Sequence, residues 1–159
     1  WDYFSSHDDP LYVSEHRTSF SVDFEIPDVI HKKADITLLA ISSTRLNTIK
    51  TVKILEKEGI LCNIIHLFWL KPFLARNAMK KAINSSVYGG IVIDGDYEGG
   101  VLKSIAFDLA QTTGAPIRVL GLEERTAGFA PHLDNLPPTP EKICDYVRGT
   151  LLKKKPKND

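Results

Sequence analysis

The chain has 159 residues, 43% of them hydrophobic and 25% charged, a balance typical of one soluble globular domain and not of a disordered chain. Twenty basic residues match twenty acidic ones, so bulk charge favours neither nucleic acid nor a membrane surface as a partner. No apolar run reaches membrane-spanning length, and Cys62 and Cys144 sit in apolar patterns that predict buried thiols and not a disulfide.

Apolar runs and turn signals predict the elements in chain order. Strands are expected over residues 11–15, 36–41, 61–67, 91–94 and 116–120. Helices are expected over about 44–58, 72–83, 98–113 and 140–151. Leu46, Ile49, Val52 and Leu55 form the predicted apolar side of the first helix, Gly59 and Gly114 are predicted C-terminal caps, and Thr139 is a predicted N-cap. This alternation predicts a mostly parallel sheet with helices on both faces.

The segment from Ile91 to Gly100 joins a predicted buried strand to an acidic, glycine-rich turn and a helix. Functional edges of open α/β sheets have this arrangement. Asp94, Asp96 and Glu98 alternate like the start of a calcium loop, but Ile105 stands where such a loop needs a bidentate carboxylate. Carboxylates here also favour the helix dipole, which is the simpler explanation of their presence.

Other candidates for chemistry are scattered. His31, His66 and His132 fall in a connector, a strand and a loop, and no zinc-binding spacing occurs. The trio Glu15-His16-Arg17 is interpreted as an ion pair at a strand edge. No phosphate-binding glycine loop and no nucleophile elbow is present, so the residues do not predict a self-contained active site.

Several passages, in order, carry a resemblance to a known family. They are Asp9-Pro-Leu-Tyr-Val-Ser-Glu-His-Arg17, Ala34-Asp-Ile-Thr-Leu-Leu-Ala40, Leu55-Glu-Lys-Glu-Gly-Ile60, His66-Leu-Phe-Trp-Leu-Lys-Pro-Phe73, Ile91-Val-Ile-Asp94 with Gly99-Gly100, Ala115-Pro-Ile-Arg-Val-Leu120 and Leu136-Pro-Pro-Thr139. In this order they resemble the C-terminal, transketolase-like domain of beta subunits of thiamine-diphosphate-dependent 2-oxoacid dehydrogenases. Two departures are Asp94, where the family usually has Glu, and the acidity of residues 95–98.

The resemblance implies a three-layer α/β/α fold whose five-stranded sheet is mostly parallel with one antiparallel edge strand. It divides the chain into the end of a preceding pyrimidine-binding module and a connector (1–33), the transketolase C-terminal-like domain (34–152) and a basic flexible tail (153–159). It also implies a cytoplasmic protein, or a mitochondrial matrix protein if the source is eukaryotic.

The resemblance further implies an accessory domain that serves subunit assembly and acyltransferase docking. Implied partners are the preceding module, an alpha subunit, a second beta subunit and a lipoyl acyltransferase. Thiamine diphosphate and magnesium belong to the complete enzyme, and no cofactor, metal or catalytic residue is expected here. Alternatives are the corresponding domain of a transketolase, a deoxyxylulose-phosphate synthase or a ferredoxin-linked 2-oxoacid oxidoreductase, and a stand-alone Rossmann-like binding module.

The predicted interface lies in the turn after the 91–94 strand. Its residues are Asp94, Asp96, Tyr97, Glu98, Gly99 and Gly100. The glycines allow a close approach, Tyr97 offers a stiff contact, and Arg45 or Arg125 is expected to offset the repulsion between carboxylates. The alternative is a solvent-exposed turn.

Overall fold

The computed structural model describes residues 2–21, 23 and 25–152. Its centre is a four-stranded parallel sheet in the order β2-β1-β3-β4. The strands are β1 (Ile36–Ile41), β2 (Cys62–Leu67), β3 (Gly90–Tyr97) and β4 (Ile117–Leu122). All six residues of β1 and of β2 are buried, as expected for strands covered on both faces.

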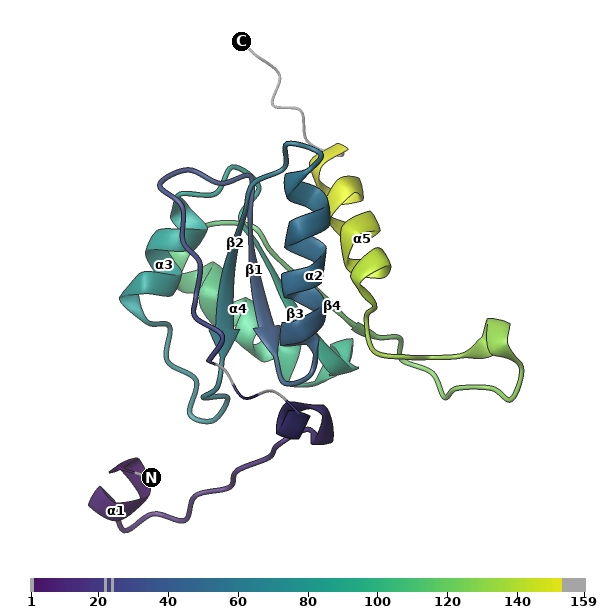
Figure 1. The fold of residues 1–159 in the computed structure, drawn as a ribbon. Helices are drawn as coiled ribbons and strands as arrows, with labels where there is room; N and C mark the ends of the chain where they lie inside the picture. Colours follow the sequence, from purple (N-terminus) through teal and green to yellow (C-terminus); the bar gives the residue numbers. More distant parts are fainter. Residues whose placement is uncertain (1, 22, 24, 153–159) are drawn as a thin grey trace.

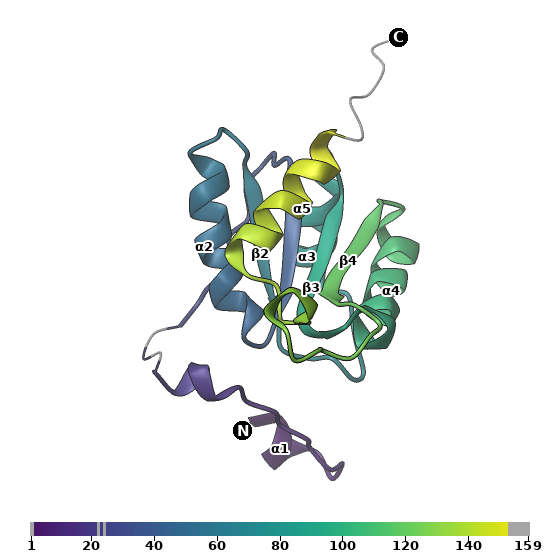
Figure 2. The same ribbon diagram turned by 90° about the vertical axis from the view of Figure 1, so that its right-hand side faces the viewer.

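Helices cover both faces of the sheet and make three layers (Figures 1 and 2). Helices α2 (Thr44–Glu56) and α5 (Pro140–Leu152) pack on one face, where Leu55, Ile143 and Val147 meet Ile36, Leu38, Ile91 and Ile93. Helices α3 (Asn77–Asn84) and α4 (Lys103–Thr113) pack on the other face, where Met79, Ile83, Ile105 and Leu109 meet Leu39, Ile65 and Val92. The predicted fold class is therefore confirmed.

The sheet edge differs from the expected five strands. The 11–15 segment forms no strand, because it lies away from the sheet with Tyr12 and Val13 exposed. Among the described residues, the antiparallel partner of β2 is a single bridge between Val29 and Ile64. The short helix α1 (Asp2–Ser6) and a 3₁₀ turn (Arg17–Ser21) precede that bridge.

Two helix starts also differ from the prediction. Helix α3 begins at Asn77 and not near Pro72, because residues 68–76 run in irregular backbone from which Leu70, Phe73 and Ala75 pack against the core. Strand β3 runs on to Tyr97 through an irregularity in its pairing with β4. A single π-helical turn (Glu98–Leu102) then leads into α4, with Gly100 in a non-helical conformation.

The predicted helix ends are confirmed at Gly59 and Gly114, which both have positive φ. Thr139 caps α5, since its hydroxyl accepts a hydrogen bond from the Lys142 amide at 3.3 Å. Cys62 and Cys144 are buried free thiols, and burial raises the pKa of Cys62 to about 12. In the described part of the chain no helix is long and apolar enough to cross a bilayer. The predicted tail, 153–159, lies outside the described residues.

Candidate interface site

The six predicted interface residues lie together where β3 ends and the π-helical turn begins. Asp94 is only 7% exposed, and its Oδ1 accepts a hydrogen bond from the Gly95 amide at 2.7 Å. Burial raises the pKa of the Asp94 carboxyl above its usual value, and the Gly95 hydrogen bond opposes that rise. Asp96 Oδ1 likewise accepts a hydrogen bond from the Tyr97 amide at 2.7 Å.

Glu98 and Gly99 form hydrogen bonds with β4 and with the residues that follow it. Glu98 Oε1 accepts a hydrogen bond from the Gly121 amide at 3.2 Å, and the Gly99 amide donates to Glu124 Oε1. A Cβ at Gly121 would collide with the Asp96 carbonyl oxygen, so this close approach requires glycine. Each carboxylate from residue 94 to residue 98 thus accepts one backbone hydrogen bond, Asp94 and Asp96 from amides of the turn and Glu98 from an amide of β4.

Gly100 and Tyr97 are among the exposed parts of this turn that remain available to another molecule. Nothing lies within 4 Å of the position that a Cβ on Gly100 would occupy. Tyr97 is 39% exposed. The turn therefore presents an open glycine and an aromatic side chain on a backbone that its own carboxylates hold in place.

The crevice where such sheets bind ligands is filled by the chain itself. In the order β2-β1-β3-β4 the switch point lies between β1 and β3, beside residues 42–44 and 94–95. Pro137 lies there against Gly95, since a Cβ on Gly95 would sit 3.4 Å from Pro137 Cβ. Asn47 of α2 donates from Nδ2 to the Pro138 carbonyl at 3.0 Å and fixes this segment.

These residues do not fit a diphosphate with its magnesium ion. Such a group needs oxygen ligands for the metal and free backbone N–H donors for the phosphates. The carboxylates here accept from their own backbone, and Pro137 occupies the crevice. Within the described ranges, no group of three or more His, Cys, Asp or Glu residues could hold a metal ion.

A second polar cluster lies at the end of β2. His66 is 1% exposed, and neither of its ring nitrogens meets hydrogen-bond geometry with a partner among the described residues, although the Pro27 backbone favours the protonated ring. Burial, assisted by the positive charge of Arg45, lowers the pKa of His66 to about 4. The Arg45 guanidinium carbon lies 4.2 Å from the centre of the Phe68 ring, and burial lowers the pKa of Arg45 as well. Sequence reasoning placed His66 in a strand but did not identify this burial.

The two arginines expected to offset the repulsion between carboxylates at the turn interact with other groups. Arg125 donates from Nε to Glu123 at 2.6 Å, and Arg45 lies over Phe68. The trio Glu15-His16-Arg17 lies in the lead segment away from the sheet (Figure 1), where Arg17 begins the 3₁₀ turn.

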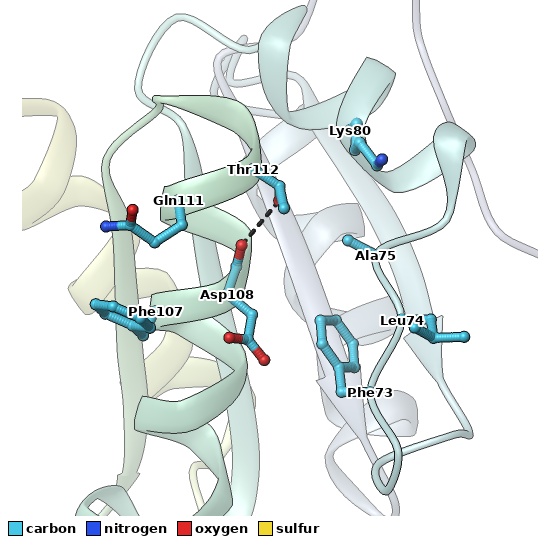
Figure 3. Close-up of a pocket in the computed structure, with 8 residues that line it drawn as sticks. All are labelled: Phe73, Leu74, Ala75, Lys80, Phe107, Asp108, Gln111 and Thr112. Carbon is cyan, nitrogen blue, oxygen red and sulfur yellow. Dashed lines mark hydrogen bonds between the residues drawn. The ribbon is translucent and has the colours of Figure 1, made fainter.

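A shallow groove opens on the other face, between α3 and α4. This groove has a volume of about 530 Å³ and is drawn in Figure 3. Its lining residues are Phe73, Leu74, Ala75, Lys80, Phe107, Asp108, Gln111 and Thr112. No sequence signal pointed to it, because its walls come from two segments that are distant in the chain.

Comparison with known proteins places this architecture in a family. The family model described as "Transketolase, C-terminal domain" matches residues 27–143, which is more than half of the chain. The chain is 33% identical over 75 residues to the pyruvate dehydrogenase E1 component subunit beta of Chlorokybus atmophyticus. That match covers 40% of this chain and 22% of the relative, so the chain spans only a small part of the relative's length.

Solved structures share the fold at low sequence identity. A split-gene transketolase, described as an inactive beta4 tetramer, has a TM-score of 0.63 at 17% identity and covers 84% of this chain and 45% of its own. The 2-oxoglutarate:ferredoxin oxidoreductase of Magnetococcus marinus has a TM-score of 0.58 at 17% identity, and the match covers 84% of this chain and 21% of the oxidoreductase chain. A transketolase of Pichia stipitis has a TM-score of 0.55 at 19% identity, and the match covers 80% of this chain and 18% of the transketolase chain.

Proposed function

Because this chain belongs to the family of transketolase C-terminal domains, we propose that it is the assembly domain of a thiamine-diphosphate-dependent 2-oxoacid dehydrogenase beta subunit. The pyruvate dehydrogenase beta subunit among its relatives supports this choice of enzyme. The solved transketolase and ferredoxin oxidoreductase structures share the fold and do not discriminate between the alternatives, because all are below 20% identical.

The complete enzyme that we propose decarboxylates pyruvate or a branched-chain 2-oxoacid and transfers the acyl group to lipoamide. Its thiamine diphosphate and magnesium are held outside this domain, by a preceding pyrimidine-binding module and an alpha subunit. Residues 1–33 are the end of that module and its connector, and residues 34–152 are the assembly domain. The enzyme works in the cytoplasm or the mitochondrial matrix. A lipoyl acyltransferase docks on the assembled subunits.

One observation supports the assembly role. At the edge where the strands end, the chain itself occupies the position of a small ligand, but the turn is exposed to the surface of another protein. Pro137 fills the crevice, and the carboxylates of Asp94, Asp96 and Glu98 hold backbone amides. Gly100 and Tyr97 face outward on this braced turn. An immobile turn loses little conformational entropy on association, and an exposed tyrosine is a favoured anchor residue. We therefore assign the contact with a second beta subunit to residues 94–100.

A glycine-to-arginine substitution tests this contact. Gly100→Arg projects a large side chain from an open position, so it should block the interface, and circular dichroism checks that the fold is kept. Gly149→Arg is the matched control, since Gly149 lies within α5 and a Cβ there also meets nothing within 4 Å. Sedimentation over a series up to about 100 μM should show self-association of the wild type and of Gly149→Arg, but only monomer for Gly100→Arg.

Two results would contradict the proposed contact. One is a wild type that stays monomeric over the whole series. The other is a Gly100→Arg variant that associates as strongly as the wild type while its circular dichroism shows a native fold.

A further inference from the structure

A small pocket lies at the edge of the sheet where the strands begin, opposite the 94–100 turn. It has a volume of about 280 Å³ and opens between residues 27–33, called the connector here, and the last turn of α3. Figure 1 shows the connector beside α3 as it runs along β2. The lining residues are Ile30, His31, Lys32, Lys81 and Ser85, and this basic pocket is named for its two lysines and one histidine.

Hydrogen bonds hold the two walls of the basic pocket in place. The connector is fixed to β2 by the Val29–Ile64 bridge, whose two backbone hydrogen bonds measure 2.9 and 2.8 Å. The buried side chain of Asn63 then joins the walls. Its Oδ1 accepts from the His31 amide at 2.8 Å, and its Nδ2 donates to the Ala82 carbonyl of α3 at 3.0 Å. A ligand would therefore meet walls that need little further ordering.

The positive charge of the basic pocket is not neutralised by its own lining. Lys32 on the connector and Lys81 on α3 are exposed, and neither forms an ion pair with a described residue. The carboxylates nearest to Lys32 in the sequence have other partners. Asp28 pairs with Arg76 at 3.4 Å, and Asp35 accepts a hydrogen bond at 2.7 Å from the amide of the residue before β2.

The carbonyl groups at the end of α3 are satisfied by the chain. Free carbonyls at a helix C-terminus would repel an anion. The Ala82 carbonyl accepts from Thr37 Oγ1 and from Asn63 Nδ2, both at 3.0 Å. The Ser85 carbonyl accepts from the Ala34 amide at 3.3 Å. These donors offset the negative end of the helix dipole, so the lysines determine the sign of the charge in the pocket.

We propose that the basic pocket binds a small phosphate-bearing ligand, either inorganic phosphate or a short phosphate ester. Lysines bind phosphate groups as point charges, and two ammonium groups from different walls match a compact group of charge about −2. The ring of His31 adds a hydrogen-bond donor. The pocket is close to the lower limit of about 300 Å³ for ligand pockets, which favours a small molecule.

The bound phosphate would connect two parts of the chain. Lys32 belongs to the connector and Lys81 to α3, so one ligand contacting both would hold the connector on β2. This inference does not depend on which thiamine enzyme the domain serves, or on whether it serves one. The pocket and the 94–100 turn lie at opposite edges of the sheet, so substitutions at one site test it without altering the other.

The first test is a titration followed by amide chemical shifts in NMR spectra. Inorganic phosphate and glycerol 3-phosphate should each bind with a Kd on the order of 1 mM or below. The largest shifts should be at His31, Lys32, Lys81 and Ser85. Acetate, which has a single charge, should bind about ten times more weakly at equal ionic strength.

A double variant and a matched control assign the binding to the pocket. Lys32→Gln combined with Lys81→Gln should weaken phosphate binding about tenfold. Lys53→Gln is the control and should bind like the wild type, because Lys53 is also an exposed lysine in the last turn of a helix but lies outside the pocket.

Four results of these titrations overturn the proposal. They are the absence of saturable shifts up to about 50 mM phosphate, equal affinity in the wild type and the double variant, an equal loss in Lys53→Gln, and acetate binding as tight as phosphate binding. A phosphoserine peptide that binds about tenfold more tightly than glycerol 3-phosphate overturns the assignment to a small molecule.

The second test measures whether phosphate holds the connector on β2. The Val29 amide donates to the Ile64 carbonyl, so its hydrogen exchange reports opening of the connector. At a phosphate concentration ten times the Kd, this exchange should slow about tenfold in the wild type. At the same concentration it should slow only about twofold in the double variant. Unchanged exchange in a saturated wild type, or equal slowing in both proteins, overturns the proposed link between the connector and α3.

Discussion

At the scale of single residues, the buried imidazole of His66 makes stability depend on pH. Its pKa is lowered to about 4 in the folded chain, first by burial and then by the charge of Arg45, whereas nearby Asp28 opposes the shift. An unfolded histidine has a pKa of about 6.5, so protons bind the unfolded chain more tightly than the folded one. Burial of the neutral His66 ring therefore has no pH-dependent cost above about pH 6.5, and the free energy of unfolding decreases as pH falls from there toward 4.

We predict that His66→Leu flattens this dependence. Between pH 7 and pH 5 the wild type should lose about 2 kcal/mol more of its free energy of unfolding than the variant. Urea unfolding at several pH values measures the difference. His132→Leu, at an exposed histidine of the loop between β4 and α5, is the control for loss of a histidine elsewhere in the chain. Parallel pH profiles for wild type and His66→Leu would contradict the assigned pKa.

Residue identity alone did not predict which side chains of α2 are buried. The apolar pattern pointed to Leu46, Ile49, Val52 and Leu55, but the fully buried set is Thr44, Thr48, Thr51 and Leu55. The threonines are accepted in the core because their hydroxyls donate to backbone carbonyls, as Thr48 does to Thr44 at 2.9 Å. A polarity scale predicts that a threonine is exposed, and only the carbonyl oxygens that accept from its hydroxyl explain why it can be buried.

At the scale of elements, a glycine that ends one helix and a glycine within another should respond in opposite ways to the same substitution. Gly114 ends α4 with φ +69°, whereas Gly149 lies within α5 without a positive φ, and a Cβ at either position meets nothing within 4 Å. Gly114→Ala should lower the free energy of unfolding by about 1 kcal/mol, because alanine is strained at positive φ. Gly149→Ala should raise it by about 0.5–1 kcal/mol through helix propensity.

Chemical denaturation of the two variants gives both values, and each serves as the control for the other. If both substitutions change the free energy of unfolding in the same direction, side-chain contacts and not backbone conformation determine the effect at these two positions. These helix ends were predictable from sequence because a glycine cap is a local signal. The start of α3 was not predictable, because Phe73 uses irregular backbone to reach a core that other segments build.

At the scale of the whole molecule, the sequence predicted the alternation of strands and helices and the location of the acidic turn. Both depend on short-range patterns, and the family match supports them. The filling of the crevice by Pro137 and the pairing of Glu124 with the Gly99 amide join segments more than twenty residues apart. No local pattern encodes such contacts. The bracing of the loop between β4 and α5 by Arg125, which donates to the Leu133 and Asp134 carbonyls, is likewise visible only in the fold.

Residues 126–133, the tip of the loop between β4 and α5, should also prove dispensable for folding. The Asn135 side chain bonds the Arg125 carbonyl, so the two ends of the tip lie close enough for a short link. Replacing residues 126–133 by Gly-Gly removes no residue of either core cluster. Shortening a loop changes its closure entropy only slightly, so the free energy of unfolding should stay within about 1 kcal/mol of the wild type. Thermal and urea unfolding measure this, and a loss of cooperativity would show that the tip supports the fold.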